Sequence, residues 1–314
     1  MRVVWRANFE MLKLVCGYFF VTLQTFLDMG AVCSVRVQCN SYTKISMTKR
    51  VLFINQEIAP YVPNTEMSLQ GRDIPNKMQE NGYEIRTFMP KWGIINERRG
   101  QLHEVIRLSG MNIIIDDTDH PLLIKVASIP QTRLQVYFID NDDYFMKRQM
   151  ALDTNGEEYQ DNGERAIFFA RGVLETVKKL RWIPDVIHCQ GWMSYVVPIY
   201  IKSAYKDDPA FENAKVVTSI FKEDLKAFKD ANFKNNIEFL GVDAPKLEAY
   251  KDEFDFEELG KMAIDYSDGI VEAEASANDT LIERALSAGK DVLKYAEGDR
   301  TATYKEFYEN LLGK

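Results

Sequence analysis

Short apolar runs alternate with amphipathic segments along most of this 314-residue chain. The first run, Val51 to Ile54, is short and partly β-branched, as expected of a strand buried on both faces. A loop containing Pro60 and Pro63 follows, and then a helical segment over 66–81. A second strand over 83–89 completes the strand–loop–helix–strand unit of a parallel α/β domain. Ligands bind beyond the carboxyl ends of the strands in such domains, so the first loop is expected on the ligand side.

The pattern after residue 90 predicts more elements of the same kind. Four short apolar runs separated by polar turns predict antiparallel hairpins attached to the sheet. Apolar residues at helical spacing then predict a long helix, followed by alternating strands and helices. The predicted fold is one doubly wound parallel sheet of the Rossmann-like α/β class. The remaining predicted strands are 105–108, 111–115, 122–126, 134–139, one within 182–192, 215–219, 268–271 and 291–293. The remaining predicted helices are one that begins near Asp161 and ends near Lys179, 194–205, two or three between 221 and 261, 259–266, 277–287 and 297–314.

Composition supports a folded chain: 46% of residues are hydrophobic and 12% are aromatic. The net charge of −8 argues against a nucleic-acid partner. Three of the four cysteines, Cys16, Cys33 and Cys39, lie in the first 46 residues, and no spacing predicts a metal site or a disulfide framework. We therefore expect a reducing, cytoplasmic location, with no metal and no cofactor.

Residues 1–46 do not follow the α/β pattern. Met11 to Leu27 is mostly apolar behind two arginines, which superficially resembles a signal peptide or a membrane anchor. Met47 to Arg50 immediately precedes the first strand, as a natural start would. We interpret 1–46 as a leader or mis-assigned start outside the fold, 47–314 as the α/β domain, and expect no membrane partner.

The first loop carries a family resemblance. Gln56-Glu57-Ile58-Ala59-Pro60, followed by Pro75, resembles the N-terminus of bacterial glycogen synthases and starch synthases, glycosyltransferase family 5. The family continues with a Lys-Thr-Gly-Gly-Leu loop whose lysine and backbone amides hold the phosphates of the sugar nucleotide. Here Pro63-Asn64-Thr65-Glu66-Met67 stands in its place. A cation is removed and an anion is added, so we expect this loop to be unfit for phosphate.

A second motif lies at the start of the long helix. Asp161, Asn162 and Arg165 match the family's Asp-Asn-x-x-Arg, which faces the cleft between its two domains. The resemblance implies that Asn162 and Arg165 contact the glucan. The alternative is that Asp161 or Asn162 simply caps the helix.

Two further motifs follow. Pro184 to Trp192 is similar to the family's Pro-Asp-Val-Val-His-x-His-Asp-Trp segment, but Gln190 replaces the second histidine and Gly191 replaces the cleft aspartate. His188 and Trp192 match, although a histidine at a strand end is more often a structural hydrogen-bonding group. Ile220 stands where the family has a histidine that contacts the transferred glucose, and isoleucine cannot donate a hydrogen bond.

The resemblance covers about residues 49–293 and implies the fold of the N-terminal half of a two-domain (GT-B) glycosyltransferase. The family, a class of hexosyltransferases, transfers glucose from ADP-glucose or UDP-glucose to an α-1,4-glucan. Its second domain supplies most of the nucleotide site, and this chain has room for only the first. Arg300 and Lys305 are spaced like that domain's Arg-Lys pair, but no Gly-rich turn precedes them.

Three hypotheses remain open. The chain is a catalytic-domain homologue that works with a separate second glycosyltransferase domain, a non-catalytic relative (a pseudoenzyme) that binds glucan or a partner protein, or an assembly domain without a ligand. We expect weak or absent sugar-nucleotide binding and no glucose transfer by residues 47–314 alone, and we assign no catalytic residue. The residues carried over as substrate contacts are Glu57, Asn162, Arg165, His188 and Trp192.

Overall fold

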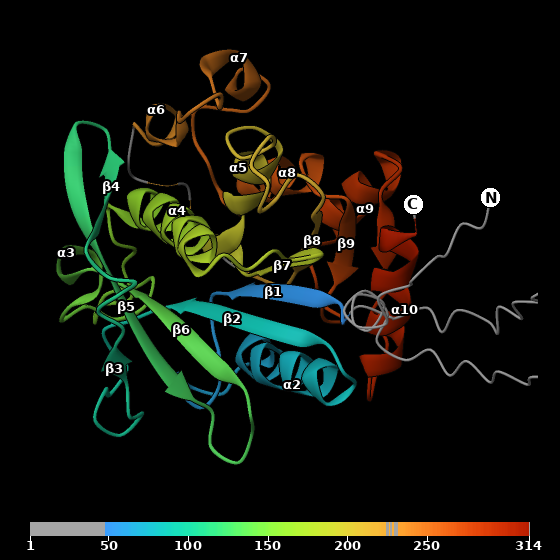
Figure 1. The fold of residues 1–314 in the computed structure, drawn as a ribbon. Helices are drawn as coiled ribbons and strands as arrows, with labels where there is room; N and C mark the ends of the chain where they lie inside the picture. Colours follow the sequence, from blue (N-terminus) through green and yellow to red (C-terminus); the bar gives the residue numbers. More distant parts are fainter. Residues whose placement is uncertain (1–47, 224–225, 227, 229–231, 314) are drawn as a thin grey trace, which may run out of the picture. The chain divides into compact units, whose positions relative to one another are not determined.

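The structure is a computed structural model that describes residues 48–313 except 224–225, 227 and 229–231. The interpretation of residues 1–46 as a leader falls outside these residues. A single ten-stranded sheet organises the described part, with helices on both of its faces (Figure 1). The strands are β1 (Arg50–Asn55), β2 (Glu84–Pro90), β3 (His103–Glu104), β4 (Met111–Ile115), β5 (Thr118–Ser128), β6 (Gln135–Asp140), β7 (Val186–Gln190), β8 (Lys215–Ile220), β9 (Gly269–Glu272) and β10 (Asp291–Leu293). The helices are α2 (Glu66–Glu80), α3 (Asp142–Phe145), α4 (Asn162–Leu180), the 3₁₀ turn η1 (Trp192–Ser194), α5 (Val197–Lys202), α6 (Phe233–Ile237), α7 (Ala244–Leu247), α8 (Phe256–Asp265), α9 (Asp279–Ser287) and α10 (Thr301–Leu312).

The order of strands across the sheet is β10-β9-β8-β7-β1-β2-β6-β5-β3, with β4 paired to β5. The pairs from β10 to β6 are parallel, and β5 joins β6, β3 and β4 in antiparallel pairs. β1 and β7 are neighbours in the centre of the sheet. The chain continues from β1 to β2 on one side of this pair and from β7 to β8 on the other side. The predicted doubly wound parallel sheet and its attached hairpins are therefore confirmed, and the topological switch point lies between β1 and β7.

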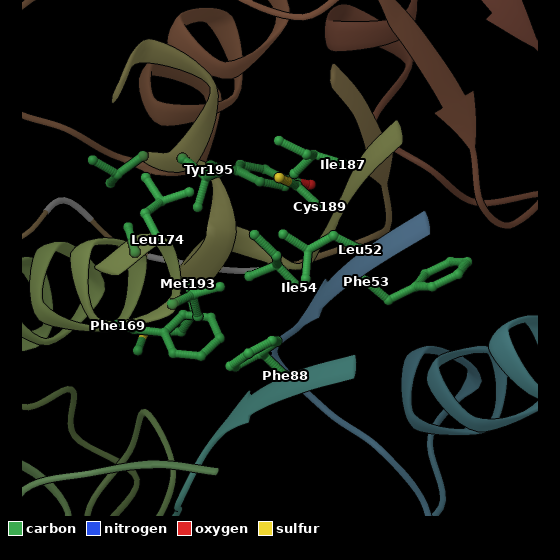
Figure 2. Close-up of a cluster of buried hydrophobic side chains, with 14 of the residues drawn as sticks. Leu52, Phe53, Ile54, Phe88, Phe169, Leu174, Ile187, Cys189, Met193 and Tyr195 are labelled. Carbon is green, nitrogen blue, oxygen red and sulfur yellow. The ribbon is translucent and has the colours of Figure 1, made fainter. Parts of the chain in front are cut away.

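The core fills both faces of this sheet because its central strands are apolar on both sides. Leu52 and Ile54 of β1 point to the side of the sheet on which Phe169 and Leu174 of α4 lie, and all four belong to one core cluster (Figure 2). Phe53 points the opposite way in the same view, as the alternation of a strand requires. All five of these side chains are fully buried. Helices α2 and α10, which contact each other, cover the face that carries Phe53.

Two predicted elements were wrong. The expected strand over 105–108 is a tight turn, in which the backbone N–H groups of Leu108 and Ser109 both donate to the carbonyl of Val105, and only the two-residue β3 pairs nearby. The expected helix over 194–205 is broken into η1 and the six-residue α5. Pro198 lies in the first turn of α5, where its missing N–H costs nothing, so the helix begins there and not at Ser194.

Candidate functional site

The carboxyl ends of β1 and β7 meet at the switch point. Asn55 and Gln190, the last residues of the two strands, are direct partners in the parallel register. The chain leaves β1 through Gln56 and Glu57 and leaves β7 through Gly191, whose φ of 83° turns it sharply into η1. Ligands of doubly wound sheets bind at this kind of edge, and two hollows lie there, one on each side of Gln56 and Glu57.

The first hollow, which we call the acidic cleft, has a volume of about 230 Å³. It lies between the end of β1, the start of α2, the end of β8 and the segment after β9. Four of its nine lining residues are glutamates, against one lysine. Its lining residues are Gln56, Glu57, Thr65, Glu66, Met67, Phe221, Lys222, Glu223 and Glu274.

The start of α2 forms one wall of the acidic cleft, and a side chain caps one of its terminal amides. Thr65 accepts a hydrogen bond from the N–H of Ser68, and the Ser68 hydroxyl accepts one from the N–H of Thr65, which is a complete capping box. The Thr65 hydroxyl donates to Glu57 Oε2 at 2.5 Å, and Glu66 lies in the first turn. Carboxylates therefore face the positive end of this helix, where a phosphate would otherwise be favoured.

Burial and mutual repulsion perturb two of these carboxylates. Burial raises the pKa of Glu57 above its ordinary value, although the bonds from Thr65 and Gln56 oppose the change. Burial, together with the charges of Glu57 and Glu274, raises the pKa of Glu223 to about 8. The surroundings therefore stabilise the ionised forms of Glu57 and Glu223 poorly, and at neutral pH Glu223 is largely protonated.

The second hollow, which we call the loop pocket, has a volume of about 590 Å³. It lies under the loop 149–154, which Asn162 Nδ2 fixes by donating to the carbonyl of Ala151 at 3.0 Å. Amide, hydroxyl and apolar groups dominate its wall. Its lining residues are Gln56, Glu57, Pro63, Trp92, Ile94, Gln149, Met150, Ala151, Leu152, Asp153 and Thr154.

Arg165, carried over as a glucan contact, lies in the core behind the loop pocket with none of its surface exposed. Its guanidinium carbon lies 5.1 Å from the ring centre of Trp92, 5.3 Å from that of Phe145 and 5.1 Å from that of Tyr159. Nη1 donates to Asn162 Oδ1 at 2.8 Å, and burial lowers the pKa of Arg165 to about 10. Both groups of the Asn162 side chain are thus used inside the protein.

The alternative that Asp161 or Asn162 simply caps the helix is wrong. Asp161 occupies the N-cap position of α4 but makes no side-chain capping hydrogen bond. Its carboxylate instead pairs with Arg148 Nη1 at 2.6 Å. The motif therefore fixes the loop that precedes the helix.

His188 lies in β7 on the face covered by α10 and is fully buried. Nδ1 forms a hydrogen bond with the hydroxyl of Tyr308 at 2.5 Å, and Nε2 forms one with the hydroxyl of Ser219 at 2.7 Å. Burial and the charge of Arg300 lower the pKa of His188 to about 3. The structural role weighed above accounts for both ring nitrogens, and the structure does not place this side chain where a ligand could reach it.

Trp192 is also buried, with 3% of its surface exposed, and its ring packs on Phe228. Ile220, at the end of β8, is fully buried. At Gly191, an added Cβ would come within 2.6 Å of Gln56 Cβ and 2.9 Å of Met67 Sδ. Gly191 therefore leaves no room for the longer polar side chain that the family has there.

Of the five residues carried over, only Glu57 lines the two hollows. The sequence reasoning did not identify Glu223, Glu274 and Leu152. Glu223 and Glu274 follow the carboxyl ends of β8 and β9 within three residues. Their position after parallel strands could have identified them in the sequence as candidates for the ligand side. Leu152, an apolar side chain that is 44% exposed, lies in a polar loop and gave no such signal.

In the described part of the chain, no three His, Cys, Asp or Glu side chains are arranged to hold a metal ion. The helices within 48–313, its gaps aside, include none that is long and apolar enough to cross a bilayer. Cys189 is free and buried.

Comparisons with known proteins agree with the fold and with the resemblance in the motifs. The family described as the starch synthase catalytic domain matches residues 50–291. A glycogen synthase of Chlorobium limicola is 34% identical over 184 residues, which are 57% of this chain and 38% of that protein. One of Chlorobaculum tepidum is 37% identical over 172 residues, covering 54% of this chain and 35% of that protein. The chain thus matches less than half the length of these relatives.

A solved structure shows the same fold. The catalytic domain of starch synthase IV from Arabidopsis thaliana, bound to ADP and acarbose, superposes with a TM-score of 0.64 at 17% identity. The match covers 82% of this chain and 53% of that one. The expected likeness to half of a GT-B glycosyltransferase is thereby confirmed.

Proposed function

Because the chain belongs to the glycogen and starch synthase family, we propose that residues 47–314 bind an α-1,4-glucan in the loop pocket without transferring glucose to it. The observation that carries this proposal is the contrast between the two hollows. The loop pocket has the mixed amide, hydroxyl and apolar wall that a sugar requires, whereas the acidic cleft opposes a diphosphate. The family's cytosolic chemistry makes the cytoplasm the compartment that fits this role.

The loop pocket suits a chain of sugar rings. Its volume of about 590 Å³ is within the range of about 300–1,000 Å³ that ligand sites usually have. Leu152 offers an apolar surface to a ring face, and Gln149 and Thr154 offer hydrogen-bonding groups to hydroxyls. Arg165 and Asn162 support this wall from behind by fixing the loop.

Transfer from a sugar nucleotide is opposed by charge. A diphosphate in the acidic cleft would lie among Glu57, Glu66, Glu223 and Glu274, with only Lys222 to offset them. Cations and N–H donors hold phosphate, whereas like charges brought together in a partly buried site repel strongly. This supports the expectation of weak or absent sugar-nucleotide binding.

The test combines two measurements on the purified chain. Calorimetric titration with maltoheptaose measures glucan binding, and incorporation of labelled glucose from ADP-glucose or UDP-glucose into glycogen measures transfer. We expect saturable binding and no incorporation. Incorporation above a blank without protein would refute the non-transferring function, and absence of both signals would direct the search to a partner protein or a second glycosyltransferase domain.

A surface substitution makes the binding test specific. Leu152→Asp should weaken maltoheptaose binding at least about tenfold, because it places a charge against the sugar face. The matched control is Leu286→Asp, on α9 and outside both hollows, where the leucine is 51% exposed. Equal effects of the two substitutions would refute binding in the loop pocket. Arg165→Ala and Trp192→Ala are unsuitable here because both would remove core packing.

A further inference from the structure

A third hollow, which we call the arginine hollow, has a volume of about 690 Å³. It lies between the segment after β1, the loop after β2 and the turn that joins β5 to β6. Ligand sites usually have about 300–1,000 Å³, so this space admits a small organic molecule. Among the described residues, it shares Ile94 with the loop pocket and none with the acidic cleft. Its lining residues are Pro60, Tyr61, Ile94, Ile95, Asn96, Arg99, Gly100, Gln101, Ser128, Ile129, Pro130, Gln131 and Thr132.

The loop after β2 forms one wall of the arginine hollow, and ion pairs fix this loop. The N–H of Leu102 donates to the carbonyl of Glu97 at 2.9 Å, which closes the loop on itself. The Glu97 carboxylate pairs with Lys91 Nζ at 2.7 Å and with Lys125 Nζ at 2.8 Å. Lys91 follows β2 and Lys125 lies in β5, so the loop is tied to two strands and the hollow is formed without a ligand.

The floor of the arginine hollow is apolar. Ile95 and Ile129 are buried in it. Tyr61 and Ile94 are half-buried and keep part of their surface in the hollow. The Tyr61 ring packs edge-on against Phe138 of β6, with 4.9 Å between the ring centres, which fixes its orientation. A flat apolar body would bury area on this floor and gain a ring contact with Tyr61.

The rim of the arginine hollow carries hydrogen-bond donors without partners. Arg99, Gln101 and Gln131 are exposed, and none of their side chains forms a hydrogen bond or an ion pair within the described residues. The guanidinium has five N–H donors, and each carboxamide has two. No Asp or Glu of the described chain lines the hollow, so nothing there balances the charge of Arg99. The rim therefore presents a positive charge and N–H donors to a ligand.

The backbone of the rim adds a second observation. Gln101 has φ 54° and Gln131 has φ 63°, in the left-handed region that residues with a Cβ seldom adopt. The two residues come from different loops and line the same hollow. Strained residues of this kind persist where the surroundings fix them, and they concentrate at ligand sites. The pair therefore marks the rim as a ligand site, in addition to the free guanidinium.

We propose that the arginine hollow binds an aromatic carboxylate, with the carboxylate on Arg99 and the ring on the apolar floor. A guanidinium and a carboxylate form two parallel, charge-assisted hydrogen bonds, and the glutamine amides can donate to the same oxygens. An uncharged sugar would leave the charge of Arg99 unmatched, and an inorganic anion would leave the floor uncovered. This inference is independent of glucan binding in the loop pocket.

The probe is 2-naphthoate, titrated into the full-length chain and followed by its own fluorescence anisotropy. The comparison compounds are 2-naphthamide, which has the same rings and a head without charge, and sodium acetate, which has the head without the rings. We expect one naphthoate per chain and at least about tenfold weaker binding of naphthamide, because the amide loses the charge-assisted hydrogen bonds. Acetate at the same concentration should not displace naphthoate.

Each contrary result has a definite meaning. No naphthoate binding, or equal binding of naphthamide, would overturn the proposal. Displacement of naphthoate by acetate at the same concentration would overturn it in favour of a site for any small anion. Displacement by maltoheptaose would overturn it in favour of a glucan site.

A neighbouring arginine provides the matched control. Arg99→Gln should weaken naphthoate binding at least about tenfold, because it removes the guanidinium that holds the carboxylate. Arg98→Gln changes the net charge equally on the same exposed loop, but Arg98 does not line the hollow, so naphthoate binding should be retained. Unchanged binding in Arg99→Gln, or equal losses in the two variants, would refute the site.

Two isosteric variants test the position of the carboxylate. Gln101→Glu and Gln131→Glu each place a second carboxylate at the rim, so naphthoate binding should fall at least about fivefold while naphthamide binding is retained. Unchanged naphthoate binding in both variants, or an equal fall for naphthamide, would refute this position. The probes contain no sugar and the variants leave the loop pocket unaltered, so failure here leaves glucan binding intact.

Discussion

Replacing Gly191 by alanine is expected to destabilise the chain by about 4 kcal/mol, although it adds a single methyl group. Gly191 has φ 83° and ψ 152°, a region that is nearly confined to glycine. Holding another residue there costs about 1–3 kcal/mol. The new Cβ would also lie 2.6 Å from Gln56 Cβ, 2.8 Å from Gln56 Oε1 and 2.9 Å from Met67 Sδ. Overpacking of this kind costs about 1–3 kcal/mol more, and the two costs together give the estimate.

A second glycine separates the two costs. Gly82 has a similar φ of 88°, but an added Cβ would meet nothing within 4 Å. Gly82→Ala should therefore cost only the backbone strain, about 1–2 kcal/mol. Urea unfolding of the parent and both variants measures the difference, with equal slopes as the check that the unfolded state is unchanged.

The outcome bears on function as well as stability. Gly191 stands where the family has a cleft aspartate, and Gly191→Asp adds to the same contacts a longer, charged side chain. We expect Gly191→Asp to be at least as destabilising as Gly191→Ala and to transfer no glucose. Equal costs for Gly191→Ala and Gly82→Ala would refute the crowding, and transfer by a stable Gly191→Asp variant would refute the reasoning entirely.

Buried ionisable groups give three further expected outcomes. Burial lowers the pKa of His188 to about 3, so the unfolded chain takes up a proton first as the pH falls below about 6.5 and stability is lost. Between pH 7 and pH 5 the free energy of unfolding in urea should fall by about 2 kcal/mol less in His188→Gln than in the parent. Equal falls in the two proteins would contradict this. Glu223 changes stability with pH in the opposite direction, because its folded-state pKa of about 8 lies above the unfolded value, so stability falls as the pH rises from 5 to 8. Glu223→Gln should remove on the order of 3 kcal/mol of that fall in the free energy of unfolding. The same dependence of stability on pH in the parent and the variant would be evidence against this. Arg165→Lys should cost about 2–3 kcal/mol in urea unfolding, because an ammonium lacks the planar guanidinium that stacks on the three rings; a cost below about 1 kcal/mol would contradict the aromatic contacts.

The sheet could be predicted from the sequence because its central strands are buried on both faces. Val51 to Ile54 reads as one apolar run, and the structure places it in the middle of the parallel sheet. Short elements carry little periodicity, so the two-residue β3 and the break between η1 and α5 were not predicted. Their boundaries depend on tertiary contacts instead.

The site was harder to predict than the fold, because burial depends on distant partners. His188 bonds to Tyr308, 120 residues further along the chain, on a terminal helix that no local motif connects to it. The family motif correctly located the edge of the sheet but not the direction in which each side chain points. Glu223 and Glu274 become neighbours only because β8 and β9 are parallel and adjacent.

The departures from the family at the switch point share their neighbours. Gln56 and Met67 occupy the space beside Gly191, and both also line the acidic cleft. Gln56 further accepts from the N–H of Met193, which fixes the turn that Gly191 begins. A substitution that restores the family residue at one of these positions therefore collides with a side chain at another position. The charge, the backbone turn and the packing would have to change together. An edge built in this way opposes the phosphate chemistry that the resemblance would assign to this position.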